Sequence, residues 1–146
     1  SLDARIAELG LGNAVLRTGK LPPADPRLIG LMQVARVALL PSISETFGLV
    51  ILEAWAAGTP AVSSRTSGAS ALIEEGRTGW LFDLGRPEAF HTAVDRVLTD
   101  RAAVEPITTA ARARVIADYD TRVLAARLGD LYAKLTEERH AHRHSA

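Results

Sequence analysis

Two glutamates on either side of a predicted helix start have the spacing best suited to chemistry. Glu45 lies in the polar segment 42–46, and Glu53 follows eight positions later in the apolar run 47–57. The first amides of a helix are unpaired and carry partial positive charge, which suits a phosphate group. Carboxylates accept hydrogen bonds from hydroxyl groups. The spacing therefore indicates a ligand that carries both a negative group and hydroxyls.

Glu53 is the charged residue in an otherwise apolar helical run. A helix that is apolar all round is normally buried, so this carboxylate must reach solvent, find a partner or face a ligand. Carboxylates near such positions often accept both hydroxyls of a ribose. With the amides of Phe47, Gly48 and Leu49 between the two glutamates, the layout fits a nucleotide sugar. The structural alternatives are a solvent-facing Glu53 and a polar segment that only caps the helix.

Short apolar runs alternate with helical patterns along the chain, and no hairpin signal separates them. Such alternation predicts an α/β domain with a mostly parallel sheet of about four strands, helices on both faces and a helical C-terminus. Ligands of open α/β sheets bind beyond the carboxyl ends of the strands, which places the segment after residue 40 at the site. The expected strands are 14–18, 37–40, 61–63 and 80–82; the expected helices are 2–9, 26–35, 47–57, 71–75, 87–98, 101–119 and 121–135.

Composition excludes several functional classes. The chain has 146 residues, 47% of them apolar, and its 17 basic and 17 acidic side chains give a net charge of zero. A neutral balance argues against a nucleic-acid platform. No run approaches the roughly 20 apolar residues of a membrane span, and the sequence has no cysteine for disulfides or thiolate metal sites.

The segment from Pro41 to Val62 resembles a known family signature. It contains Pro-Ser-x-x-Glu-Thr-Phe-Gly-Leu-x-x-x-Glu-Ala and then Gly-Thr-Pro-Ala-Val, with the two glutamates at positions 45 and 53. This pattern resembles the Glu-x7-Glu signature of the retaining GT-B glycosyltransferases of group 1, also called family 4. The resemblance extends in order over residues 2–100. It implies a Rossmann-like GT-B C-terminal domain.

The resemblance also implies roles for single residues. Glu45, with the backbone at Phe47, Gly48 and Leu49, would contact the donor sugar and diphosphate, and Glu53 would bind the ribose. No metal and no separate cofactor would be required, because amides, a helix start and basic side chains hold the diphosphate. No catalytic residue is assigned within the chain. Two basic residues near the end of the expected strand 14–18, Arg17 and Lys20, are candidate nucleotide contacts. The alternative is that both are ordinary surface charges.

The sequence departs from the family pattern in two places. Ala71 stands three residues after Gly68, where members usually have a glutamate, and Glu74 and Glu75 are out of register. The family's preceding Gly-Arg…Lys-Gly region, which carries an Arg and a Lys for the diphosphate, has no match. We therefore expect a partial domain over residues 1–136 that holds the last four strands of six, followed by a loose polar tail over 137–146. The exposed edge of strand 37–40 would then pair with a missing segment or with another copy, or strand 14–18 would move beside it.

The resulting expectation is the donor-binding half of a retaining enzyme that transfers a hexose from a UDP-, GDP- or ADP-sugar to an acceptor hydroxyl. The isolated chain is expected to be inactive without its acceptor-binding N-terminal domain. The resemblance implies a cytoplasmic enzyme, or one peripheral to the membrane at full length. The alternatives are a noncatalytic interaction module derived from such a domain and a GT-B sugar-nucleotide epimerase. Ligand-observed NMR with nucleotide sugars distinguishes the binding functions from the interaction module.

Overall fold

The computed structural model describes residues 1–22 and 25–144, in two compact units that are treated separately, Ser1–Gly30 and Leu31–Ala146. The first unit contains α1 (Leu2–Glu8), which begins where the Ser1 hydroxyl accepts a hydrogen bond from the Ala4 amide at 3.3 Å. Helix α2 (Pro26–Val34) runs across the boundary between the units. The expected turn residues Pro23 and Ala24 lie outside the described part of the chain.

The second unit is built on a parallel sheet, as the alternating pattern predicts. Strands β1 (Ala38–Leu40), β2 (Ala61–Ser64) and β3 (Trp80–Phe82) pair in the order β1-β2-β3. Leu39 aligns with Val62, and Ser63 aligns with Leu81. Between the strands lie α3 (Leu49–Ala57) and α4 (Ser67–Leu72), and after them come α5 (Pro87–Thr99), α6 (Arg101–Tyr119) and α7 (Thr121–His144).

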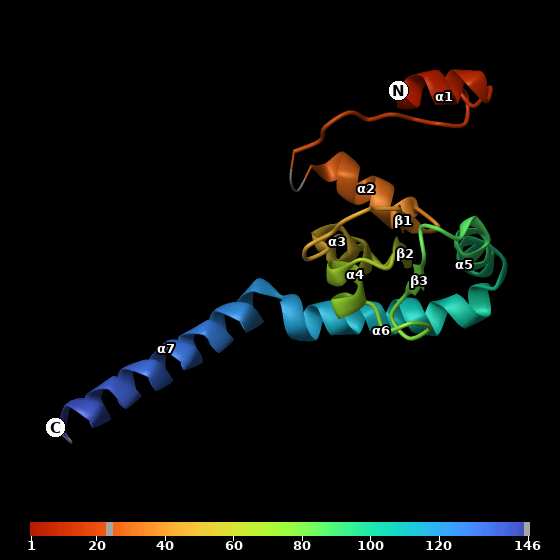
Figure 1. Cartoon of the computed structure of the whole chain (residues 1–146). Helices are drawn as coiled ribbons and strands as arrows, with labels where there is room; N and C mark the ends of the chain where they lie inside the picture. Colours follow the sequence, from red (N-terminus) through yellow and green to blue (C-terminus); the bar gives the residue numbers. More distant parts are fainter. Residues whose placement is uncertain (23–24, 145–146) are drawn as a thin grey trace. The chain divides into compact units, whose positions relative to one another are not determined.

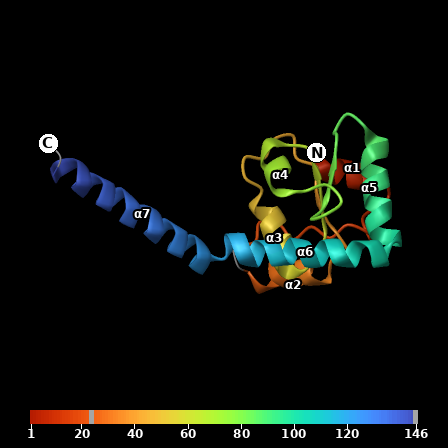
Figure 2. The same ribbon diagram turned by 90° about the horizontal axis from the view of Figure 1, so that it is seen from below.

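Helices cover both faces of this sheet. Figure 1 shows α3 and α4 on one side and α5 on the other. The side chains of the strands alternate in the same way: Leu40 and Leu81 belong to one buried cluster with α3 and α4, whereas Val62 belongs to a second cluster with α5. Helix α6 contacts both, because Val104 lies in the second cluster and Val115 in the first. Figure 2 shows α6 running between the two sides.

The expected strand at 14–18 is wrong. Residues 15–20 have no regular secondary structure, and Leu16 is 80% exposed. An apolar run forms a strand only where a neighbouring strand supplies ladder hydrogen bonds. The described sheet therefore has three strands instead of four.

Helix α3 begins later than the apolar pattern indicates, and helix α4 begins earlier. Helix α3 begins at Leu49 because Gly48, at φ 88°, is left-handed and caps the helix instead of joining it. Helix α4 begins at Ser67, since the Thr66 hydroxyl accepts the Ala69 amide at 3.2 Å, and it ends at Leu72 instead of 75.

The C-terminal segment is more helical than expected. Helix α7 continues through 137–144, where we predicted a loose tail, while Ser145 and Ala146 lie outside the described residues. None of its described side chains over 121–138 is buried. Four leucines at helical spacing are about half exposed: Leu124, Leu128, Leu131 and Leu135. No helix within the described residues is long and apolar enough to cross a membrane.

Candidate functional site

The loop from Pro41 to Gly48 joins β1 to α3 at the carboxyl end of the strands. The end of β2 holds the start of this loop in place, because the Ser64 hydroxyl donates to the carbonyl oxygens of Leu40 (3.2 Å) and Ser42. Ser63 is buried beside it and also lies within hydrogen-bond distance of the Leu40 carbonyl, at 3.4 Å. The sheet thus provides a rigid base for the polar loop.

Glu45 is the central residue of this loop and is held on two sides. Its carbonyl oxygen accepts from the Gly68 amide at 2.9 Å and from the Ser67 hydroxyl at 3.2 Å, which fixes the loop to the start of α4. Its carboxylate Oε1 accepts from the Gly48 amide at 3.1 Å. The carboxylate therefore lies at the N-terminus of α3, as the spacing predicts.

Gly68 has no room for a side chain. A Cβ placed there would lie 2.7 Å from the Glu45 oxygen and from the Phe47 nitrogen. The two backbones approach closely because this position is a glycine. The sequence shows that Gly68 stands among small residues, but the contact that requires a glycine appears only in the structure.

The start of α3 offers open amides beside the Glu45 carboxylate. The Gly48 amide is used by Glu45, whereas those of Phe47 and Leu49 have no acceptor within the described residues. The Phe47 ring is half-exposed and lies edge-on to Tyr119, with ring centroids 6.3 Å apart. An anion at this position would meet free N–H groups and the positive end of a helix.

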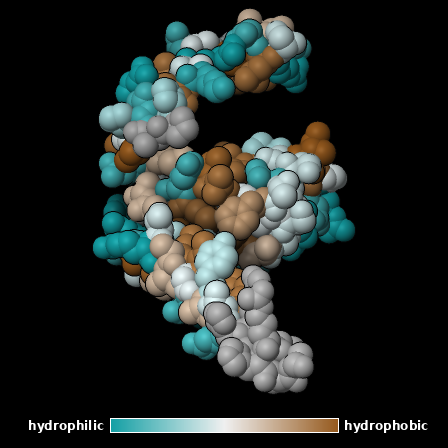
Figure 3. All heavy atoms as spheres, turned by 90° about the vertical axis from the view of Figure 1, so that its left-hand side faces the viewer, coloured by the Kyte–Doolittle hydropathy of each residue, from teal (hydrophilic) through white to brown (hydrophobic). Residues whose placement is uncertain are grey.

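Glu53 lies on the exposed side of α3, four residues after the helix begins. No ion pair or hydrogen bond of its side chain exists within the described residues. Its neighbours on this side are apolar and exposed, with Leu49 at 63% and Val50 at 42%. Figure 3 shows apolar surface gathered at the centre of the face on which α3 lies. A carboxylate among exposed apolar side chains is typical of a surface that meets a ligand or a partner.

The other charged candidates from the sequence are Arg17, Lys20, Glu74 and Glu75. Arg17 pairs with Asp3 within the first unit, where exposed Lys20 also lies, so the nucleotide contacts of both remain predictions. The two glutamates near Ala71 are engaged elsewhere: Glu74 pairs with Arg77 (2.6 Å) and Arg114 (2.9 Å), and Glu75 accepts from the Leu81 amide (2.9 Å). Neither replaces the family's glutamate. Within the described residues, no three histidine or acidic side chains come together as a metal site requires.

The sequence of this chain is similar to those of known glycosyltransferases. The family model "Glycosyl transferases group 1" matches residues 1–114. D-inositol 3-phosphate glycosyltransferase from Corynebacterium urealyticum is 37% identical over 151 residues, covering 99% of this chain and 34% of that protein. Glycogen synthase from Mycobacterium tuberculosis is 39% identical over 105 residues, covering 72% of this chain and 25% of that protein.

Solved structures share the fold. Anabaena HepE in complex with UDP and glucose has a TM-score of 0.80 at 26% identity, covering 91% of this chain and 35% of that one. Sucrose-phosphate synthase from Thermosynechococcus elongatus has a TM-score of 0.81 at 30% identity, covering 94% of this chain and 34% of that one. This chain spans between about a fifth and a third of the length of the first relatives it matches. The fold is that of a GT-B domain, and the chain belongs to the group 1 glycosyl transferases.

Proposed function

We propose that this chain is the donor-binding half of a retaining glycosyltransferase that transfers a hexose from a nucleotide diphosphate to an acceptor hydroxyl. The observation that carries the proposal is the start of α3, where open amides lie between the Glu45 carboxylate and exposed Glu53. The solved relative HepE binds UDP-glucose, which supports a nucleotide sugar as the ligand.

In this proposal the diphosphate lies at the amides of Phe47 and Leu49, where the helix end attracts negative charge. The Glu53 carboxylate accepts both ribose hydroxyls, since its side chain has no competing partner in the described chain. Glu45 accepts hydroxyls of the donor sugar. Its carboxylate remains close to the Gly48 amide, which it contacts at 3.1 Å, so that amide helps to orient it.

The proposal also includes partners. The open edge of β1 would pair with a strand from a longer form of the enzyme or from a second copy. An acceptor-binding domain would complete the active site across from α3. Because the chain spans at most about a third of the length of the first relatives it matches, donor binding is the activity to assay on it, and we expect no sugar transfer without that domain.

Saturation-transfer NMR of the 146-residue chain with UDP-, GDP- and ADP-glucose tests the donor proposal. We expect one nucleotide sugar to give a clear signal. Glu53→Gln should lower its affinity by roughly 10–100-fold, the usual effect of losing hydrogen bonds to a charged group. Glu88→Gln changes an exposed glutamate on α5 and should leave the signal unchanged. Absence of binding by all three donors would contradict the proposal and favour the interaction module. Equal affinity of Glu53→Gln and the parent chain would remove the ribose role.

A further inference from the structure

A cleft lies at the amino-terminal end of the parallel strands, opposite the end at which the donor site lies. Arg36 lies two residues before β1 and Pro60 lies immediately before β2, whereas Glu45 follows the end of β1. The cleft has a volume of about 500 Å³, within the usual range of small-molecule sites. It belongs entirely to the second unit and is formed by the segment before β1, the turn after α3, the end of α5 and the first half of α6.

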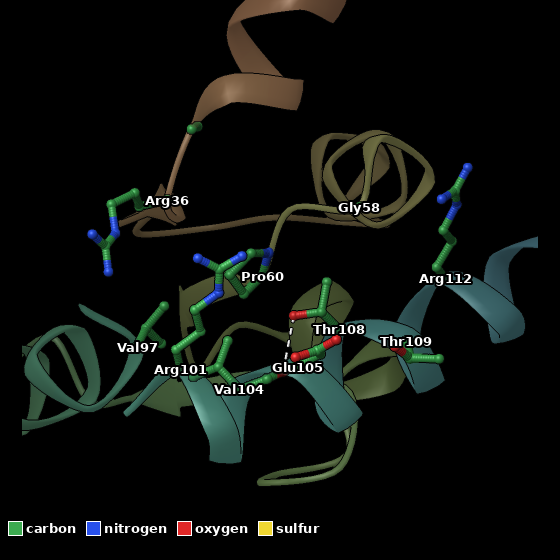
Figure 4. A pocket seen from close by; sticks show the side chains of 11 residues that line it. Arg36, Gly58, Pro60, Val97, Arg101, Val104, Glu105, Thr108, Thr109 and Arg112 are labelled. Atoms are coloured by element: carbon green, nitrogen blue, oxygen red, sulfur yellow. Dashed lines mark hydrogen bonds between the residues drawn. The ribbon is translucent and has the colours of Figure 1, made fainter. Parts of the chain in front are cut away.

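The floor of this cleft is apolar and its rim is polar. Pro60, Val97 and Val104 are buried at its base. Above them, Glu105 and Thr109 expose a carboxylate and a hydroxyl, while the Thr108 hydroxyl is used by the Val104 carbonyl at 3.0 Å. Figure 4 shows these α6 side chains along the cleft, with Arg36 and Arg101 on one side and Arg112 on the other. Apolar floors with a few polar groups are typical of sites for small organic ligands.

Positive charge gathers here in a chain whose net charge is zero. Three arginines line the cleft against one glutamate, a local excess of two positive charges (three minus one). Arg36 donates from Nη2 to the Leu98 carbonyl at 2.8 Å, which fixes its guanidinium at the rim. Arg101, the first residue of α6, and Arg112 form no ion pair within the described residues. Unpaired like charges around one cleft repel each other until an anion neutralises them.

We propose that this cleft binds a small organic phosphate. The phosphate group lies against Arg36 and Arg101, because guanidinium groups bind phosphate through paired hydrogen bonds. The hydroxylated body of the ligand extends along α6, where the Glu105 carboxylate accepts from hydroxyls and the Thr109 hydroxyl can donate or accept. Its C–H groups lie on the apolar floor. The donor site takes no part in this binding.

Amide NMR shifts of the whole 146-residue chain, titrated with ribose 5-phosphate, ribose and inorganic phosphate, test the proposal. Ribose 5-phosphate should shift the amides of residues 36, 58–59, 101–105 and 107–112 and leave those of 47–53 unchanged. It should bind more tightly than either fragment. Absence of shifts in the cleft, or shifts confined to 47–53, would overturn the proposal. Equal affinity of ribose 5-phosphate and inorganic phosphate would overturn it in favour of a plain anion site.

Variants of exposed arginines separate specific binding from general charge. Arg101→Gln should weaken ribose 5-phosphate binding at least about tenfold, since it removes a charge-assisted hydrogen bond. Arg77→Gln makes the same charge change on an exposed arginine outside the cleft and should leave the affinity unchanged. Both side chains are exposed, so both variants should fold like the parent chain. Equal losses in the two variants would show that only net charge matters and would refute the site.

Discussion

Gly68 is the residue at which the donor loop depends most directly on the absence of a side chain. We predict that Gly68→Ala lowers the free energy of unfolding by about 1–3 kcal/mol, because the added Cβ would force backbone atoms apart. A Cβ there would lie 2.7 Å from the Glu45 oxygen. Urea unfolding measures the change.

Gly85→Ala provides the matched control for that variant. A Cβ at Gly85 would have no neighbour within 4 Å, and its φ is not in the left-handed region. Its unfolding free energy should therefore change by less than about 1 kcal/mol. Equal destabilisation by the two alanines would mean that the close approach at Gly68 carries no cost.

Much of the candidate site could be predicted at the residue scale. The spacing of Glu45 and Glu53 predicted one carboxylate before the start of α3 and one within the helix, and the structure has them in these places. The bond from the Gly48 amide to the Glu45 carboxylate could not be predicted, since it depends on the left-handed φ of 88° at Gly48. The ion pair of Arg17 with Asp3 was missed for a similar reason, because it forms between segments distant in sequence.

At the scale of elements, β1 pairs with β2 along one edge, and no strand of the described residues pairs with its other edge. The Ala38 amide donates to the Pro60 carbonyl at 2.9 Å, so the next amide, that of Leu39, points away from β2. We predict that hydrogen exchange at Leu39 is much faster than at Ala38 and Leu40. In a longer form of the enzyme, or in a dimer that uses this edge, Leu39 should become protected. Equal protection of the three amides in the monomeric 146-residue chain would contradict this assignment.

The junction between α6 and α7 should respond to acid. Hydrogen bonds from Arg122, first its side chain and then its backbone, lower the pKa of Asp120 from 3.8 to about 2. Because the folded pKa is depressed, the bonds contribute fully above the unfolded value and are lost as the pH falls through about 2. An NMR titration of the Asp120 carboxyl should give a midpoint near 2, and Arg122→Gln should move it toward 3.8. An unchanged midpoint would exclude the Arg122 side chain as the cause.

The elements also show where sequence patterns are insufficient. The runs at 37–40, 61–63 and 80–82 were correctly predicted as strands, because each is apolar and has a neighbour to pair with. The run at 14–18 also begins with three apolar residues, but within the described residues it has no ladder partner, and it forms no strand. Helix α7 extends to His144 because polar residues with helical preference continue the helix without needing burial. Local patterns therefore predict the type of a segment more readily than its pairing or length.

For the second unit as a whole, α6 joins two buried clusters into one cooperative core. Val97 belongs to the α5 cluster and Val115 to the α3 cluster. We predict that Val97→Ala and Val115→Ala each lower the free energy of unfolding by about 1–3 kcal/mol. Each should give a single urea transition with an unchanged slope, because α6 contacts both clusters. A second transition in either variant would show that the clusters unfold independently.

The two tryptophans are distributed one to each face of the sheet. Trp55 lies in the α3 cluster and Trp80 in the α5 cluster, and the indole nitrogens of both are buried without a hydrogen-bond acceptor in the described chain. Dry, unbonded indoles emit at short wavelength, so the folded chain carries two intrinsic fluorophores that shift to the red only when their own side of the sheet admits water. Trp55→Phe would leave Trp80 as the reporter of the α5 cluster, and Trp80→Phe would leave Trp55 as the reporter of the α3 cluster. Intrinsic tryptophan fluorescence can thus report unfolding on each face of the sheet separately, without any attached dye.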